Sequence, residues 1–178
     1  MRITKIIPLA AVLVPVLALT ACGSDADTPE EVADEAAEAM AEGPMPQPGQ
    51  YRTTATLLEF TMPGAPPEAA DMLRGAFAEG AAEPTTYCLT PEQAQTSRED
   101  MLKNMAESNC TVSSFSMEGG RIDAALSCPA GEGVSGDVTM HGTMSETGSD
   151  IEMTFTAPAP ANATIKMHMV SERVGECS

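Results

Sequence analysis

The chain has no tryptophan, and aromatic residues make up only 3% of its 178 residues. Its interior must therefore be filled by aliphatic side chains and by methionine, which occurs 13 times. A core of this kind contains few large side chains. Disulfide bonds contribute most to a fold whose hydrophobic core is small. The composition therefore predicts that the cysteines are structural.

Basic residues are also scarce, with nine Lys and Arg against 26 Asp and Glu, for a formal net charge of −17. Such an acidic surface disfavours nucleic acid and anionic lipid headgroups as partners. The chain has only two histidines, and neither a nucleophile-elbow motif nor a phosphate-binding loop is present. These absences favour a non-enzymatic protein without a cofactor, with a periplasmic enzyme of unknown reaction as the alternative.

No apolar run is long enough to span a bilayer comfortably. A positively charged start is followed by an apolar stretch at residues 6–19, which is typical of a secretory signal. The stretch ends in Leu19-Thr20-Ala21-Cys22, which resembles the bacterial lipobox, in which the cysteine is acylated and the chain is cleaved before it. We therefore predict that residues 1–21 are a lipoprotein signal peptide and that Cys22 is the lipidated N-terminus.

The lipid anchor would also determine where the protein is found. The signal carries two positive charges and no negative ones, so its removal changes the net charge from −17 to −19. Acyl chains on Cys22, and not charge, would therefore hold the protein at the membrane. By resemblance to other lipoproteins, Gly23 in place of Asp favours the outer membrane, with the domain in the periplasm.

Residues 22–47 are expected to form an acidic, Pro-rich tether that lifts the domain off the membrane. Thr28-Pro29-Glu30-Glu31 has the form of a helix N-terminus. Residues 32–42 lack a strong apolar stripe, so we expect a marginal, solvated helix or disorder there. The prolines of residues 43–49 then end any helix and form a stiff spacer.

Residues 48–178 are predicted to be one disulfide-bonded domain of mainly β, α+β class. Apolar residues alternate in most of its segments, which indicates a curled antiparallel meander of six to seven strands with two short helices inserted near the start. Thr90-Pro91-Glu92-Gln93 has the form of a capping box at the second helix. Strands are expected at 51–61, 85–89, 110–117, 121–128, 134–144, 151–156 and from 165 onward, and helices at 68–78 and 91–107.

The segment from Cys110 to Cys128 predicts a β-hairpin with a cysteine at each end. If residues 118–120 form a three-residue loop, Met117 pairs with Arg121 and Cys110 lies directly opposite Cys128. Directly opposed residues are close enough for a disulfide bond. The same register collects Val112, Ile122, Ala124 and Leu126 on one face, which is the reason to prefer it.

Four cysteines remain in the mature chain, and four cysteines allow three pairings. Once Cys110 is paired with Cys128, Cys88 must pair with Cys177, which fastens the C-terminus to an earlier strand. The cysteines form no C-x-x-C motif and have no paired histidine, so a zinc site is not expected.

The methionines suggest two further hypotheses. Met167-His168-Met169 raises the alternative of a copper-binding protein that uses Met and His. Successive side chains of a strand point to opposite faces, however, so these three would not share one ion and no metal site is predicted. The inward methionines are instead expected to pack in the core and to line a pocket for an apolar ligand. The expected lining residues are Met140, Met144, Met153, Phe155 and Met167.

The chain also resembles a family of uncharacterised bacterial exported proteins, recorded as a domain of unknown function. Tyr51 stands where that family commonly has Trp. The resemblance implies a fold and an exported location but no activity. Our leading hypothesis is therefore a membrane-tethered periplasmic domain that binds a partner protein or an apolar ligand. The periplasmic enzyme named above is the second hypothesis, and a purely structural role in the cell envelope is the third. The matching motifs are Pro48-Gly49-x-Tyr51, Met62-Pro63-Gly64, Cys88-Leu89-Thr90-Pro91-Glu92, Cys110…Gly119-Gly120-Arg121…Cys128 and Arg173-Val174-Gly175-Glu176-Cys177.

Overall fold

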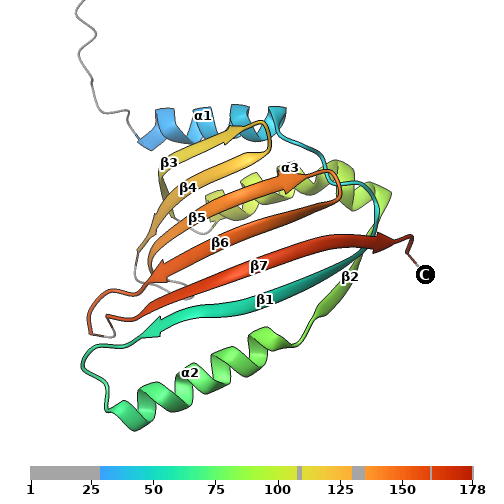
Figure 1. The fold of residues 1–178 in the computed structure, drawn as a ribbon. Helices are drawn as coiled ribbons and strands as arrows, with labels where there is room; N and C mark the ends of the chain where they lie inside the picture. The colour runs from blue at the N-terminus through green and yellow to red at the C-terminus, as the bar shows by residue number, and fades with distance from the viewer. Residues whose placement is uncertain (1–28, 108–109, 130–134, 161, 178) are drawn as a thin grey trace, which may run out of the picture.

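The computed structural model of the protein describes residues 29–107, 110–129, 135–160 and 162–177. In this part of the chain, seven strands form one open antiparallel sheet, and three helices accompany it (Figure 1). The predicted mainly β class is confirmed, with one helix more than the two expected. In chain order the elements are α1 (Pro29–Glu42), β1 (Gly49–Thr61), α2 (Pro67–Ala82), β2 (Thr85–Leu89), α3 (Pro91–Glu107), β3 (Thr111–Glu118), β4 (Arg121–Cys128), β5 (Gly136–Ser145), β6 (Gly148–Thr156) and β7 (Thr164–Gly175).

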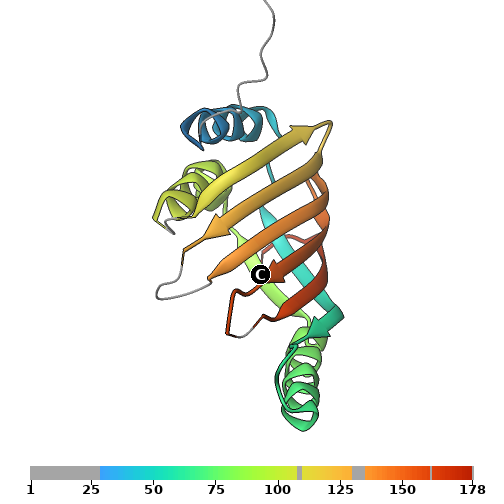
Figure 2. The ribbon, with the colours of Figure 1, turned by 90° about the vertical axis from the view of Figure 1, so that its left-hand side faces the viewer.

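The strands follow the order β2-β1-β7-β6-β5-β4-β3, so strands β3 to β7 form the predicted meander. Strand β1 lies between β2 and the last strand, β7, and pairs with β7 along nearly its whole length. The sheet is strongly twisted and curls around one face (Figure 2). We call this the inner face and the opposite one the outer face.

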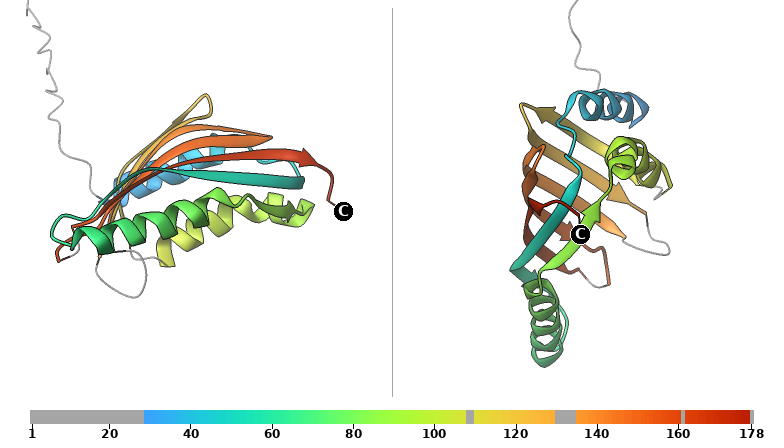
Figure 3. Two further views of the ribbon diagram at one scale, coloured as in Figure 1. Left: turned by 60° about the horizontal axis from the view of Figure 1, so that its bottom comes forward. Right: turned by 90° about the vertical axis from the view of Figure 1, so that its right-hand side faces the viewer.

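The helices lie at the two ends of the inner face. Helix α1 packs on β3, with α3 beside it, whereas α2 packs on β1 at the other end (Figures 2 and 3). Within the described residues, no helix makes extensive contact with the central strands β5, β6 and β7. The closest helix–sheet contacts are therefore at the two ends of the inner face.

Helix α1 is a packed part of the domain. Ala36 is 0% exposed and Met40 4% exposed, and both contact Val112 of β3. The helix expected within residues 32–42 is present, but the expectation that it is solvated, and the alternative of disorder, are wrong. An apolar residue at every fourth position, beginning at Val32, gives a stripe that is narrow but sufficient to dock on a strand.

The hairpin of β3 and β4 differs from the prediction at its turn. Glu118 pairs with Arg121, which leaves a two-residue turn at Gly119-Gly120 in place of the three-residue loop. Both glycines have positive φ, 58° and 82°, as a tight hairpin turn requires. The predicted pairing of Met117 with Arg121 is therefore wrong by one residue, and Met117 pairs with Ile122.

The other end of the hairpin has the predicted register, because a β-bulge between Val112 and Ser114 compensates for the shorter turn. Beyond the bulge, Cys110 and Cys128 form the predicted disulfide, with 4.1 Å between their Cα atoms. The bulge has a packing reason. Val112 and Phe115 are an odd number of residues apart, so only an extra residue lets both reach α1 from the same face.

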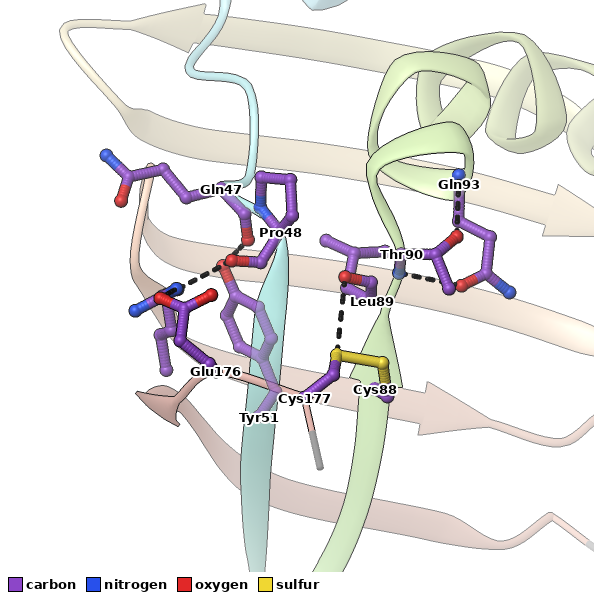
Figure 4. The surroundings of a disulfide bond; sticks show 10 residues. Gln47, Pro48, Tyr51, Cys88, Leu89, Thr90, Gln93, Glu176 and Cys177 are labelled. Atoms are coloured by element: carbon purple, nitrogen blue, oxygen red, sulfur yellow. Dashed lines mark hydrogen bonds and ion pairs between the residues drawn. A yellow bond between two sulfur atoms is a disulfide. The ribbon is translucent and has the colours of Figure 1, made fainter.

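The second predicted disulfide is also confirmed. Cys88 of β2 is bonded to Cys177, with 5.5 Å between their Cα atoms, and this bond fastens the C-terminus to the edge of the sheet (Figure 4). Immediately after β2, the predicted capping box begins α3. The backbone N–H of Thr90 donates to the Gln93 side chain at 3.0 Å, and the backbone N–H of Gln93 donates to the Thr90 hydroxyl at 3.2 Å.

Candidate functional site

The inner face of the central strands carries a row of methionines. Met140 of β5 lies directly opposite Met153 of β6, and Met153 lies directly opposite Met167 of β7. Met169 stands two residues beyond Met167 and faces Ile151. Directly opposed residues of an antiparallel sheet share a face, so all these side chains lie on the middle of the inner face.

Two adjoining cavities lie over these residues. The central cavity, of about 280 Å³, is bounded by β5, β6, β7, β1 and Tyr87 of β2. The outer cavity, of about 400 Å³, lies between the sheet and α2. Both cavities are lined by Thr53 and Met169, and together we call them the groove. The central lining is Thr53, Tyr87, Met140, Ser149, Ile151, Met153, Met169 and Ser171. The outer lining is Thr53, Ala55, Ala76, Phe77, Gly80, Ala81, Glu83, Thr85, Met167 and Met169.

The predicted ligand-binding residues do not all lie in one place. Met140 and Met153 line the central cavity, and Met167 lines the outer one. Met144 lines a separate, more polar pocket of about 330 Å³ at the turn between β5 and β6. Phe155 is on the inner face opposite Ile165 of β7, outside these three cavities.

Sequence reasoning missed several residues of the groove. Met169 and Ile151 have the right strand alternation and could have been included once β6 and β7 were paired. Tyr87 gave no such signal, because its position depends on β2 joining the far side of β1. The residues of α2 could not have been predicted, because nothing local indicates which part of the sheet that helix covers.

The outer face carries a row of charged side chains across four strands, in which Asp123, His141, Glu152 and His168 are direct neighbours. His141 Nδ1 lies 2.5 Å from an Asp123 oxygen, and its side chain is 64% exposed. Nε2 of His168 lies 2.7 Å from an oxygen of Asp150, which stands two residues before Glu152 on β6. Each histidine thus has a carboxylate partner on an exposed surface, on the side of the sheet away from the groove.

Glu152 has a distinct electrostatic environment in this row. Lys166 Nζ donates to a Glu152 carboxylate oxygen at 2.5 Å. This hydrogen bond, together with the nearby positive charge, holds the pKa of Glu152 below its usual value, although partial burial acts in the opposite direction. The row is a network of charged pairs that keeps this face of the sheet polar.

The geometry argues against the copper hypothesis that combined Met and His. His168 reaches Asp150 on the outer face, whereas Met167 and Met169 line cavities on the inner face. Among the described residues, no three or more His, Cys, Asp and Glu side chains are placed to hold a metal ion.

The residues next to the Cys88–Cys177 disulfide form a structural clamp. The Tyr51 hydroxyl donates to the Gln47 carbonyl oxygen at 2.8 Å (Figure 4). The Glu146 carbonyl oxygen lies 3.1 Å from the same hydroxyl. The Tyr51 ring stacks on Tyr87, with 5.5 Å between ring centroids. Arg173 donates from Nε to the Pro48 carbonyl oxygen at 2.8 Å. The clamp fixes β2, and hence Tyr87, at one side of the central cavity.

The predicted lipidation site, Cys22, lies outside the described residues. In the part of the chain that the structure covers, no helix is both long and apolar enough to cross a membrane.

The protein is thus an open, curled antiparallel sheet with a groove on its inner face. Two disulfides cross-link it, and helices pack at its ends. The chain belongs to the protein family described as "Protein of unknown function (DUF3617)", whose model matches residues 46–177. The predicted likeness to a domain of unknown function is thereby confirmed. Neither the curated proteins nor the solved structures contain a match to the chain.

Proposed function

We propose that this protein is a membrane-anchored bacterial lipoprotein whose periplasmic domain binds an apolar ligand in the groove without catalysing a reaction. The observation that carries the proposal is the pair of adjoining cavities on the inner face. Thioether and aliphatic side chains of β5, β6 and β7 line them, and α2 borders only the outer cavity.

A concave apolar surface of this kind favours ligand binding over simple packing. Ligand pockets are typically about 300–1,000 Å³, lined by apolar side chains with a few polar groups. The two cavities, of about 280 and 400 Å³, adjoin each other and fall near this range. Methionine side chains are flexible and polarisable, so such a lining can adapt to chains of different shape.

The lining also suggests the class of ligand. The groove runs from the central strands to the space under α2, which suits an extended aliphatic chain. Hydroxyl groups of Thr53, Ser149 and Ser171 border the central cavity, and the carboxylate of Glu83 borders the outer one. Because the chain carries a net charge of −17, an anionic headgroup would be repelled. A neutral, single-chain lipid therefore fits best.

The anchoring half of the proposal is supported by the lipobox-like sequence before Cys22 and by the position of α1. Since α1 is docked on the sheet, only residues 23–28 separate Cys22 from the folded domain. Six residues span at most about 20 Å when fully extended. The groove would therefore stay close to the bilayer, which supplies aliphatic ligands, and Gly23 favours the outer membrane.

Photo-crosslinking tests the ligand half. The lipidated protein would be reconstituted in liposomes that contain a neutral long-chain alcohol with a photoreactive diazirine, and adducts would be mapped by peptide mass spectrometry. We expect adducts on β5, β6, β7 and α2. Met153→Glu places a charge in the central cavity and should remove most of them.

The matched control is Met72→Glu, because Met72 lies on α2 and is 70% exposed. Equal labelling of the Met153→Glu and Met72→Glu proteins would rule out the groove as the binding site. The anchor is tested separately by Cys22→Ser in a chain produced without residues 1–21, which should be released from liposomes in a flotation assay. Retention of the unlipidated chain on the liposomes would contradict the proposed anchor.

A further inference from the structure

We propose that the central cavity binds the soft monovalent cation Cu(I) through the thioether sulfurs of Met140, Met153 and Met169. All three side chains line the same cavity, of about 280 Å³. They come from three adjacent strands, β5, β6 and β7, so the site is assembled by the sheet and not by a sequence motif.

The strand register makes Met153 a neighbour of both Met140 and Met169 on the inner face. Met140 lies directly opposite Met153, and residues in this relation have Cβ atoms about 4.5–5.5 Å apart. Met169 is a diagonal neighbour of Met153, since Met167 is its direct partner and Met169 stands two residues further along β7. Diagonal neighbours are within reach of long side chains, and methionine has three rotatable bonds to bring its sulfur inward.

The chemistry of the cavity selects a soft ion. Thioethers are neutral, polarisable ligands that suit Cu(I), whereas hard cations such as Mg²⁺ and Ca²⁺ require oxygen ligands, especially carboxylates. The lining of the central cavity includes no carboxylate and no imidazole, and its other members are hydroxyl or aliphatic residues. The net charge of −17 raises the local concentration of cations around the domain without providing hard ligands inside the cavity.

This site differs from a Met-His copper site and does not depend on the proposed apolar ligand. His168 lies on the outer face and takes no part. An aliphatic ligand needs only an apolar lining, which leucine would provide equally well, whereas Cu(I) needs the sulfur atoms. Replacement of methionine by leucine therefore separates the two functions.

The test is a competition titration of the full lipidated chain in detergent, under anaerobic conditions, between the protein and a chromophoric Cu(I) chelator. Ag(I) serves as a probe that does not change oxidation state. We expect one ion per chain. The triple variant Met140→Leu/Met153→Leu/Met169→Leu should lose measurable Cu(I) binding in this competition, because it lacks all three ligands.

Leucine nearly conserves the volume of methionine, and circular dichroism would establish that the triple variant is folded. Met45→Leu/Met72→Leu, at exposed positions 41% and 70% accessible, is the matched control and should bind Cu(I) like the unmodified protein. Equal affinity of the triple variant and the control, or no binding by the unmodified chain, would overturn the proposal. Crosslinking of the diazirine alcohol should persist in the triple variant, so failure of the cation site and failure of the lipid site give different results.

Discussion

Gly120 has a backbone φ of 82°, and a Cβ added there would lie 2.5 Å from the Met144 carbonyl oxygen. Its own carbonyl oxygen accepts a hydrogen bond from the Met144 N–H at 2.6 Å, so the hairpin turn and β5 are held together at this point. Gly120→Ala should lower the free energy of unfolding by about 1–3 kcal/mol, because alanine is strained at positive φ and the neighbouring atom is backbone. Urea unfolding measures this change.

Gly75→Ala is the control for this prediction. Gly75 lies inside α2, and a Cβ added there would meet nothing within 4 Å. Alanine favours a helix over glycine by about 0.5–1 kcal/mol, so this variant should be unchanged or slightly more stable. If both variants lost stability equally, the strained turn could not be the cause.

Tyr51 offers a second prediction at the residue scale. Its side chain is 3% exposed and its hydroxyl donates to a backbone carbonyl oxygen, so Tyr51→Phe removes one buried hydrogen bond. We expect a loss of about 0.5–1.5 kcal/mol in the free energy of unfolding at neutral pH, measured by urea unfolding. An unchanged midpoint of urea unfolding would mean that the hydrogen bond makes no net contribution to the free energy of unfolding.

The same residue predicts a pH dependence. Burial, and secondarily the proximity of Tyr87, raises the pKa of Tyr51 above its usual value near 10. A raised pKa means that folding favours the protonated phenol. The corresponding stability is present below the unfolded pKa and is lost as the pH rises through the folded pKa. Between about pH 9 and 11, the unmodified protein should therefore lose stability more steeply than Tyr51→Phe, which lacks this titration.

At the scale of elements, the two disulfides should contribute unequally. The Cys110–Cys128 bond closes a loop with a sequence separation of 18, and the Cys88–Cys177 bond one of 89. The chain-entropy model credits them with about 3 and about 4–5 kcal/mol respectively. Replacement of each pair by alanine, followed by thermal unfolding, should thus show the larger loss for Cys88 and Cys177. The reverse order would indicate that the hairpin bond mainly stabilises the folded state.

At the scale of the whole molecule, the docking of α1 should control the distance between domain and bilayer. With α1 packed through Ala36 and Met40, the span from Cys22 is limited to about 20 Å. Ala36→Asp/Met40→Asp should release the helix and allow residues 23–47 to reach a total span of at most about 85 Å. Neutron reflectometry of the lipidated protein on a supported bilayer would then show a thicker, more diffuse protein layer.

Ala41→Asp places the same side chain on the exposed face of α1 and is the control. It should leave the thin layer of the unmodified protein unchanged. A layer that is equally thin for the Ala36→Asp/Met40→Asp protein would show that something other than α1 docking holds the domain near the membrane.

Much of the fold could be predicted from local patterns. The alternation along β4 to β7, the capping box at Thr90 and the pairing of Cys110 with Cys128 depend on residues near one another in the chain. The second disulfide then followed by elimination. The error at the hairpin was not local, because the bulge that corrects the register lets Val112 and Phe115 both contact α1, which comes from a distant part of the chain.

The groove could be predicted only in part. The amino-acid sequence by itself determined which side chains of β5, β6 and β7 face inward, because strand alternation is a local property. Only the tertiary structure decided that β1 pairs with β7, that α1 docks on β3, and that α2 packs on β1 and borders the outer cavity. These depend on contacts between distant parts of the chain, which local periodicity does not encode. Whether an apolar face becomes core or a groove is therefore set by what packs against it.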